Sequence, residues 1–311
     1  MVYSIDMATV GIVGGTGFVG KYLTKLLTAQ GNEVIIFTRD PNKYAASGKV
    51  TYAAFDAKRG NCDIEALKKL DSVVHLAGAG IADKRWSDAR KKEILDSRVE
   101  STNLLTSTLK AHASHCKTFV AASATGFYGP DSRPNQPFTE QAAPYNDFLG
   151  ETCNTWENAS KKGAEFMRTT LLRFGIVLGK ESGAFPEFVK PMAFGIMPIL
   201  GSGKQMVSWI EVEDLARLIL FAINNEQVSG IYNAVSPNPV SHRELMNTIA
   251  KAKGGLKIPA PVPAFVLQIM LGELSIEVLK SCNVSAQKIT DAGFEFSYPD
   301  IKSATLHILA K

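Results

Sequence analysis

Val10-Gly-Ile-Val-Gly-Gly-Thr-Gly-Phe-Val-Gly20 is an apolar strand that runs into three glycines and then straight into an amphipathic stretch at 21–30. Gly14 permits a tight turn, Gly17 lets the backbone approach a pyrophosphate closely, and Gly20 lets the next helix pack on its strand. The N–H groups at the start of that helix face the anion. The pattern predicts a dinucleotide site with contacts from Gly14, Thr16, Gly17, Phe18, Val19 and Gly20. The alternative is a glycine-rich turn that only closes an α/β unit.

The composition is that of a globular protein with a large core. The chain has 311 residues, 45% of them hydrophobic, and its 34 basic and 30 acidic residues give a formal charge of +4. The basic residues are dispersed, which argues against nucleic-acid binding. The cysteines at 62, 116, 153 and 282 lack the paired spacing of a zinc site, so we expect no metal and a reducing compartment.

The chain shows no pattern of a membrane protein or of a secreted one. No apolar run approaches the roughly 20 residues needed to cross a bilayer. The N-terminus contains Asp6 and lacks the layout of a signal peptide. We therefore expect a cytoplasmic protein without a membrane partner, in which residues 1–6 form an extension before the first strand.

Strand and helix patterns alternate through the first 180 residues, which predicts a parallel sheet with helices on both faces. After the glycine turn, the expected strands are 33–38, 50–55, 72–76, 117–122 and 167–177, and the expected helices are 63–70, 87–111 and 147–162. Ser87 is the expected N-cap of the long helix.

The pattern loosens after residue 180 and then resumes. Prolines and glycines interrupt 186–203, strand-helix-strand patterns return at 207–235, Ser241 and Glu244 form a capping box, and a further helix is expected at 264–271. We expect an α/β fold: a Rossmann-type doubly wound parallel sheet with a smaller C-terminal substrate lobe. Its predicted limits are 1–180 with 207–235 for the nucleotide-binding body, and 181–206 with 236–311 for the lobe.

The end of the second strand indicates which nucleotide binds. An acid about 20 residues after the glycines usually binds a free ribose 2′-hydroxyl, but here the chain reads Thr38-Arg39-Asp40. Arg39 can bind a 2′-phosphate through two N–H groups, and Lys43 adds charge, so NADP is favoured over NAD. The alternatives are a solvated Arg39 and a ribose-binding Asp40, although Asp40 precedes Pro41 and is interpreted as a turn residue.

Further motifs follow the glycine turn in order, namely Phe55-Asp56, His75-Leu-Ala-Gly78, Ser123-Ala-Thr-Gly-Phe-Tyr-Gly129 and Leu172-Arg-Phe-Gly-Ile-Val-Leu-Gly179. In this order they resemble the extended short-chain dehydrogenase/reductases. A second set resembles the atypical epimerase-like subfamily that has its own C-terminal domain of unknown function. That set comprises Gly80-Ile-Ala-Asp-Lys-Arg-Trp86, Asp96-Ser-Arg98, Asp147-Phe-Leu149, Trp156-Glu157, Gly201-Ser-Gly203, Ser208-Trp-Ile210 and Gly293-Phe-Glu-Phe296.

The resemblance implies a Rossmann body that binds NADP, with Asp56 near the adenine and Ala77 and Gly78 beside the ribose or nicotinamide. Members are usually described as sugar-nucleotide epimerases or oxidoreductases, and relatives in plastids and cyanobacteria have been linked to division. Each residue also has a structural interpretation: Asp56 caps a turn, His75 is a hydrogen-bonded core histidine, and Ala77 and Gly78 keep a loop tight.

The catalytic pair of the broad family is absent. That family uses Tyr-x-x-x-Lys on one helix, in which the lysine lowers the pKa of the tyrosine. Here Phe148 and Leu149 are followed four residues later by Thr152 and Cys153. The remaining candidates for proton transfer are Ser123, with Thr125 nearly equivalent, and the tyrosines Tyr128 and Tyr145.

Two arginines are candidate substrate ligands. Arg98 stands where the broad family usually has Asn, and a buried arginine there needs an anionic partner such as a substrate carboxylate or phosphate. Arg85, with Lys84 and Trp86, follows the fourth strand and can line the same cleft, although surface charge and packing explain these residues equally well. Arg173 is expected to pair with Glu157 or Glu213.

Two functions fit these observations. The first is an NADP-dependent oxidoreductase or sugar-nucleotide epimerase that acts on a small, anionic molecule with a non-standard catalytic group. The second is a non-catalytic NADP-binding regulator or interaction protein linked to cell division. The sequence is compatible with an oligomer and does not identify the substrate.

Overall fold

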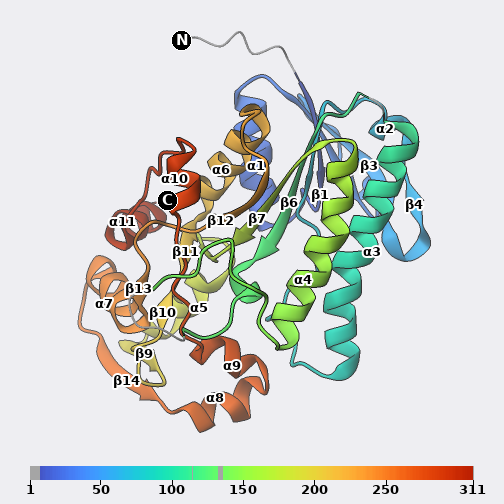
Figure 1. The fold of residues 1–311 in the computed structure, drawn as a ribbon. Helices are drawn as coiled ribbons and strands as arrows, with labels where there is room; N and C mark the ends of the chain where they lie inside the picture. Colours follow the sequence, from blue (N-terminus) through green and yellow to red (C-terminus); the bar gives the residue numbers. More distant parts are fainter. Residues whose placement is uncertain (1–7, 114, 132–135, 311) are drawn as a thin grey trace.

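A large parallel sheet forms the centre of the protein, seen here in a computed structural model (Figure 1) that describes residues 8–113, 115–131 and 136–310. The extension expected at residues 1–6 lies outside these described residues. In the described part the main sheet has eight strands in the order β12-β7-β6-β5-β1-β2-β3-β4, all parallel except β4. The strands are β1 (Thr9–Val13), β2 (Glu33–Thr38), β3 (Val50–Asp56), β4 (Asn61–Cys62), β5 (Ser72–His75), β6 (Thr118–Ala124), β7 (Arg168–Phe174) and β12 (Gly230–Ala234).

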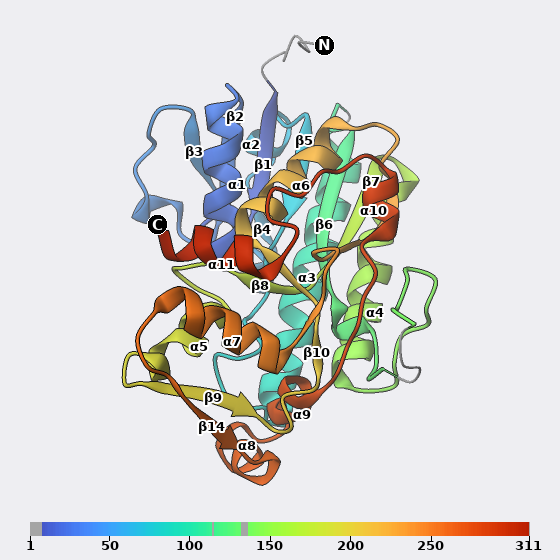
Figure 2. The same ribbon diagram turned by 90° about the vertical axis from the view of Figure 1, so that its left-hand side faces the viewer.

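Helices cover both faces of this sheet, which confirms the doubly wound class. Figures 1 and 2 show α1 (Phe18–Ala29) and α6 (Val212–Asn224) on one face, with α3 (Asp88–His112) and α4 (Phe148–Lys161) on the other. Alternation along β1 supplies both cores: Ile12 belongs to the cluster with α1 and α6, whereas Val13 belongs to the cluster with α3. The short helix α2 (Ile64–Leu67) covers the expected 63–70 only in part.

Side-chain caps fix where the long helices begin. Ser87 accepts a hydrogen bond from the Arg90 N–H at 3.3 Å, as expected for α3, and Asp147 accepts one from the Gly150 N–H at 2.8 Å for α4. Ser241 accepts from the Glu244 N–H at 3.2 Å, so the predicted capping motif opens α7 (His242–Lys253).

Most of the remaining elements form a smaller lobe beyond the carboxyl ends of the strands, at the lower left of Figure 1. It contains α5 (Ala184–Met192), α7, α8 (Ala264–Leu271), α9 (Leu274–Leu279) and a parallel pair of strands, β9 (Ile196–Leu200) and β14 (Ile258–Val262). Short pairs join it to the body: β10 (Met206–Val207) with β13 (Val240–Ser241), and β11 (Trp209–Glu211) with β8 (Ile176–Leu178). The chain ends with α10 (Gln287–Asp291) and α11 (Ile301–Ala310), and 3-10 turns lie at Pro41–Lys43, Ala57–Arg59, Thr125–Phe127 and Lys162–Glu165.

The strand expected at 167–177 is two strands, because Gly175 breaks it. A Cβ at this position would lie 2.6 Å from the carbonyl oxygen of Ser208, the residue before β11. The chain therefore packs closely on this residue and then continues as β8. The stretch around Pro259 and Pro261, which precedes the helix expected at 264–271, is strand β14. The domain limits proposed from the sequence stay a prediction.

The outer edge of β12 is covered by polar side chains. Its sheet partner is β7, and on its other side Lys288 donates to the Ile231 carbonyl at 2.6 Å, while the Asn233 N–H donates to Glu140 at 2.9 Å. The Asn233 amide also donates to the Ser285 carbonyl at 3.1 Å. Glu140 from the middle of the chain and Lys288 from its last part thus bond backbone groups on the open side of an edge strand.

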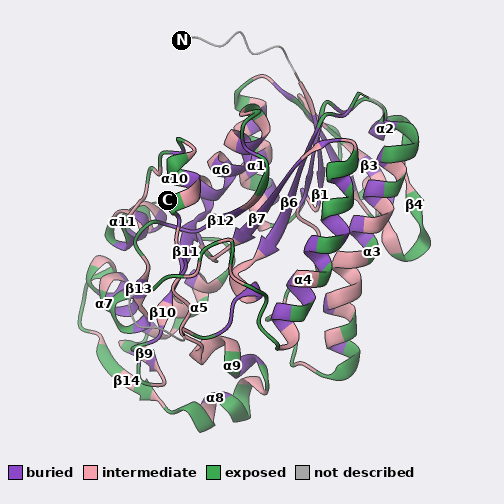
Figure 3. Cartoon of the chain, viewed as in Figure 1, coloured by how far each residue is buried: buried purple, intermediate pink, exposed green. Residues whose placement is uncertain are grey.

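Burial is uneven across the molecule. Figure 3 shows a buried central sheet, whereas α8 and β14 are largely exposed and carry exposed apolar side chains such as Phe265, Ile269 and Ile258. Across the described ranges, none of the helices combines the length and apolarity needed to span a membrane.

Candidate functional site

The glycine turn is shaped by close backbone contacts. Gly14 has φ +87°, and a Cβ there would lie 2.8 Å from the Ala77 nitrogen, so the turn packs on the loop after β5. A Cβ at Gly20 would lie 2.5 Å from the Gly15 Cα, so α1 starts directly against the turn. Both positions require glycine, because a Cβ at either would clash with backbone atoms.

The N-terminus of α1 is open to an anion. Gly17 is its exposed N-cap, no side chain caps the helix, and its first turn contains no acid. Thr16, Phe18 and Val19 are half-buried around this point. The first N–H groups of a helix carry partial positive charge, so this end can bind a phosphate.

Phe18 joins this turn to the chain after β8. A Cβ at Gly179 would lie 2.5 Å from the Phe18 ring, and one at Gly183 would lie 3.3 Å from it. The segment 179–183 therefore lies against the start of α1, a contact that spans more than 150 residues of chain and that the sequence pattern did not predict.

Arg39 lies at the end of β2 beside a cavity of about 390 Å³ that is also lined by Thr38, Asp40, Lys43 and Tyr44. The Asp40 carboxylate forms an ion pair with Lys43 at 3.5 Å, and Arg39 forms none with any described residue. The exposed Arg39 guanidinium is thus available to a ligand, whereas Asp40 is engaged within its own turn.

Asp56 and Ala77-Gly78 have visible structural roles. The Asp56 carboxylate accepts from the Lys58 N–H at 3.1 Å and pairs with Arg59 at 3.7 Å, so it caps a turn as well as lying at the carboxyl end of β3. Ala77 contacts the glycine turn, and Gly78 is exposed one residue further along.

The loop between β5 and α3 is held by hydrogen bonds to α3 and within itself. Arg90 donates to the Gly80 carbonyl at 2.5 Å, the Trp86 ring N–H donates to the Ile81 carbonyl at 2.7 Å, and the Ala79 N–H donates to Ser97 at 2.9 Å. This loop therefore presents a fixed surface to the carboxyl edge of the sheet.

Ser123 and Tyr128 belong to one buried network. The Ser123 hydroxyl donates to Glu157 at 2.7 Å, and Arg173 donates to both oxygens of Glu157 at 2.7 and 2.9 Å. Arg173 also donates to the Tyr128 hydroxyl at 2.8 Å, and that hydroxyl donates to Asn233 at 2.7 Å. The predicted pairing of Arg173 with Glu157 is confirmed. Nothing in the sequence pattern indicated that Asn233 completes the network.

Burial separates the three predicted catalytic hydroxyls. Ser123 is 2% exposed and Tyr128 0% exposed, and burial raises the pKa of Tyr128 to about 12, against the opposing effect of Arg173. Tyr145, in contrast, is 45% exposed just before α4, with its ring against Gly129. Thr125 is half-buried, and its hydroxyl makes no hydrogen bond to a described residue.

Arg85 reaches across to the lobe. A Cβ at Gly272 would lie 3.0 Å from the Arg85 Nε, and Lys91 forms an ion pair with the neighbouring Glu273. Trp86 packs edge-on against Phe148 at the start of α4, with ring centroids 4.9 Å apart. The loop after β5 therefore meets both α4 and the turn before α9.

Arg98 lies under the same loop. Its Nη1 donates to the carbonyls of Ala79 and Ile94 at 3.0 and 2.9 Å, and its guanidinium lies 5.2 Å from the centre of the Trp156 ring. Burial is the main cause that lowers the pKa of Arg98, and the neighbouring Arg90 adds to the effect. No carboxylate of a described residue lies within ion-pair distance.

His75 is a core histidine with one hydrogen bond. One ring nitrogen lies 3.0 Å from the Ser101 hydroxyl, while Nδ1 has no partner among the described residues. Burial, followed by the charge of Arg98, lowers the pKa of His75 to about 4, so the ring is neutral at pH 7.

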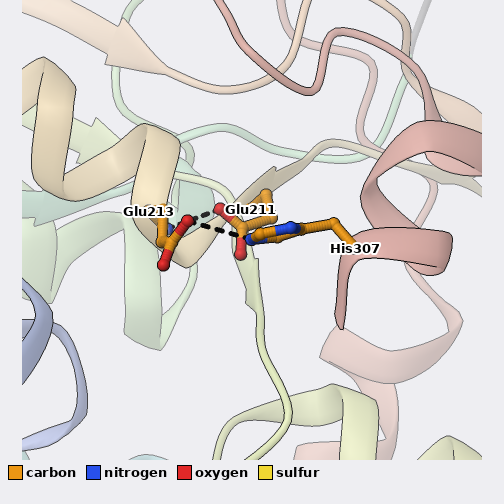
Figure 4. Close-up of side chains that lie close together, drawn as sticks. All are labelled: Glu211, Glu213 and His307. Carbon is orange, nitrogen blue, oxygen red and sulfur yellow. Dashed lines mark hydrogen bonds and ion pairs between the residues drawn. The ribbon is translucent and has the colours of Figure 1, made fainter. Parts of the chain in front are cut away.

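A group of metal-ligand type, which the sequence did not predict, lies at the start of α6. Figure 4 shows Glu211, Glu213 and His307 together, with their ligand atoms within 4.8 Å of one another. Glu211 caps α6 by accepting from the N–H groups of Glu213 and Asp214 at 2.5 and 3.1 Å, and Glu213 lies 2.9 Å from His307. The bond between Glu213 and His307 joins α11 to α6, and the absence of a metal stays a prediction.

Fold and turn together define a dinucleotide-binding protein of the doubly wound class. The profile of the NAD dependent epimerase/dehydratase family matches residues 10–234, and that of a domain of unknown function (DUF1731) matches 262–308. The chain belongs to the NAD dependent epimerase/dehydratase family and carries this second domain at its C-terminal end, as the resemblance implied.

Similar proteins span nearly the whole chain. The epimerase family protein YfhF of Bacillus subtilis is 35% identical over 303 residues, covering 97% of this chain and 98% of YfhF. The human epimerase family protein SDR39U1 is 30% identical over 300 residues, covering 96% and 98%.

Two solved structures share the fold at similar identity. The crystal structure of human SDR39U1 (isoform 2) with NADPH superposes with a TM-score of 0.85 at 28% identity, covering 97% of this chain and 99% of that one. A nucleoside-diphosphate sugar epimerase from Corynebacterium glutamicum gives 0.77 at 30% identity, covering 98% of this chain and 58% of that one.

Proposed function

We propose that the protein is an NADP-dependent oxidoreductase or sugar-nucleotide epimerase with a non-standard active site. The observation that carries this proposal is the combination of an uncapped α1 N-terminus and an Arg39 without an ion-pair partner among the described residues. The human relative solved with NADPH supports it. In this proposal Gly14, Thr16, Gly17, Phe18, Val19 and Gly20 hold the pyrophosphate, and Asp56, Ala77 and Gly78 line the remaining path of the cofactor.

NADP is favoured over NAD because of the charges at the end of β2. Arg39 binds the 2′-phosphate, and the ion pair between Asp40 and Lys43 leaves Asp40 engaged instead of free for a ribose hydroxyl. When bound, the cofactor supplies or accepts a hydride, and the protein must supply the accompanying proton transfer.

The proton is assigned to a hydroxyl at the carboxyl ends of β6 and its neighbours. Of the three candidates only Tyr145 is exposed, so we assign the proton transfer to Tyr145 first. Ser123 and Tyr128, which are held in the buried network with Glu157 and Arg173, are the other two candidates. Arg85, which lies in the loop after β5 and contacts the lobe, and Arg98, which lies under that loop, are the proposed ligands of a small-molecule substrate.

The burial of Ser123 and Tyr128 also favours a second function. Both hydroxyls are fully engaged in holding β6, β7 and α4 together, and no lysine follows Phe148 or Leu149 at the family spacing. A non-catalytic NADP-binding regulator, linked to cell division through an interaction partner, would need the same fold without the chemistry. Both candidates take the protein as cytoplasmic, without nucleic-acid or membrane partners, and leave its oligomeric state to measurement.

One experiment separates these two functions. The purified protein is incubated with NADP(H) and a panel of sugar nucleotides and small carbonyl compounds in deuterated water, and products are read by mass spectrometry and NMR. Turnover that Tyr145→Phe abolishes, with NADPH binding preserved, supports the enzyme. NADPH binding with no hydride transfer across the panel supports the regulator. The exposed variant Lys25→Ala, on α1, is the matched control.

A further inference from the structure

Arg98 carries a positive charge that the protein itself does not neutralise. The Arg98 side chain is half-buried, with its guanidinium packed between Trp156 and the loop after β5, and a Cβ at Gly78 would lie 3.2 Å from its Cζ. Among the described residues it has no carboxylate partner, and a charged group that acts on it, Arg90, is another cation, whose own charge is paired with Glu93. A guanidinium removed from water without a counter-charge lowers the stability of the protein unless a ligand supplies the negative charge.

Cys153 does not supply the missing charge. It lies on α4, 4% exposed, and burial raises the pKa of its thiol to about 12 despite the nearby Arg98. The thiol is therefore neutral at pH 7. His75, on the other side, is neutral as well.

The guanidinium has one edge engaged and one edge available. Nη1 donates its two hydrogen bonds to the carbonyls of Ala79 and Ile94. Nε and Nη2 form no hydrogen bond with any described residue, and neither is sealed from solvent. The two N–H groups along this edge match the spacing of two oxygens on a carboxylate or phosphate.

We propose that this edge of Arg98 is the receptor for an oxyanion of the substrate, a carboxylate or a phosphate. The inference rests on the proposed function and adds the chemical class of the substrate. Gly14 contacts Ala77, whereas Arg98 contacts Gly78, one residue further along the loop. The pyrophosphate has its own site at the N-terminus of α1, so the oxyanion at Arg98 belongs to the second ligand.

The test is anion binding to the protein saturated with NADPH, followed by calorimetry and by tryptophan fluorescence. Inorganic phosphate and acetate are the probes. Because Trp156 lies against Arg98, the bound probe changes its fluorescence, and Trp156→Phe assigns that change. The variants are Arg98→Gln, Arg98→Lys, which keeps the charge but loses the two-point geometry, and Arg243→Gln, an exposed arginine of α7 that serves as control.

We expect wild type and Arg243→Gln to bind a probe, Arg98→Gln to bind it at least about tenfold more weakly, and Arg98→Lys to lie between, with NADPH affinity unchanged in all. Equal binding by wild type and Arg98→Gln, or no binding to wild type at up to about 50 mM, overturns the inference. If Arg98→Gln instead weakens NADPH about tenfold and phosphate competes with NADPH, the oxyanion is the cofactor's and the substrate assignment is overturned. Failure of turnover with Arg98-dependent anion binding would overturn the proposed enzyme function and leave the receptor intact.

Discussion

Glu157 of α4 and Arg173 of β7 form a two-point ion pair at 2.7 and 2.9 Å, with 1% and 2% of their side chains exposed. The pair also fixes Ser123 and Tyr128, and with Asn233, which accepts from Tyr128, five side chains share one network. Its role in stability can be separated from any role in chemistry.

Glu157→Gln is expected to lower the free energy of unfolding by about 3–5 kcal/mol, because the Arg173 charge stays buried without its counter-charge. Urea denaturation measures this loss. In the control, Lys110→Met removes one partner of an ion pair whose side chains are both 61% exposed, and it costs less than about 1 kcal/mol. Similar losses for the two variants would contradict the structural role of the network.

Arg39→Ala is expected to weaken NADPH binding about tenfold or more and to leave NADH binding within about threefold, because only NADPH carries the 2′-phosphate. Isothermal titration calorimetry measures both constants. Lys25→Ala, an exposed change on α1, leaves both unchanged. Equal losses for the two nucleotides would show that Arg39 does not read the 2′-phosphate.

Gly14→Ala is expected to destabilise the fold by about 2–4 kcal/mol and to abolish NADPH binding, because it combines φ +87° with a backbone nitrogen 2.8 Å from the new Cβ. Gly60→Ala is the matched control: φ is +62°, nothing lies within 4 Å, and the cost is about 1–2 kcal/mol with NADPH binding retained. Thermal unfolding and calorimetry provide the two readouts. An unchanged cofactor affinity in Gly14→Ala would refute the role of the turn.

Tyr145→Phe is expected to reduce turnover about a hundredfold or more while stability and NADPH affinity stay as in wild type, because the hydroxyl of this exposed residue is the proposed proton donor. Tyr128→Phe has the opposite profile: it removes the partner of Arg173 and Asn233 and costs about 1–3 kcal/mol of stability. Rates with the panel substrate and urea denaturation distinguish them. A stable Tyr128→Phe protein without turnover would move the proton transfer to Tyr128.

Stability is expected to fall as the pH drops from about 6.5 toward 4. Burial lowers the pKa of His75 and of His242 to about 4 each, below the ordinary value of 6.5. Between these values the unfolded chain binds protons that the folded protein does not, so the free energy of unfolding rises with pH in this window. The loss between pH 7.5 and pH 5 is about 2 kcal/mol per histidine.

Urea denaturation at the two pH values checks this, with His75→Asn expected to lose a smaller amount of stability on acidification than wild type. His115→Asn, at an exposed position, keeps the dependence of wild type. An identical acid response in all three proteins would mean that His75 is not the group responsible.

The fold was predictable from sequence because its determinants are local. The glycines at 14, 17 and 20 mark the first turn, and capping residues such as Ser87 and Ser241 mark helix starts that the structure confirms. The error at Gly175 has a non-local cause, since only the approach of Ser208 shows that the strand must break there.

The site was less predictable, because hydrogen-bond partners come from distant elements. Ser123 reads as a catalytic hydroxyl until the structure shows its proton directed at Glu157. Asn233 belongs to none of the sequence motifs. It reaches the network because the pairing of β12 with β7 places it beside Arg173. The contact of Phe18 with Gly179 and Gly183 likewise depends on the return of the chain after β8.

The polar cover of β12 bears on how the chain can be cut. The family profile ends at residue 234, the last residue of β12, yet Lys288, from the second profile, donates to a backbone carbonyl of that strand, and the Ser285 carbonyl accepts from the Asn233 side chain. A truncation after residue 234 would expose the edge of β12, which could then pair with strands of other chains. By covering the edge of β12, the C-terminal domain is therefore expected to protect the protein from self-aggregation. A recombinant fragment of the body alone is expected to be insoluble.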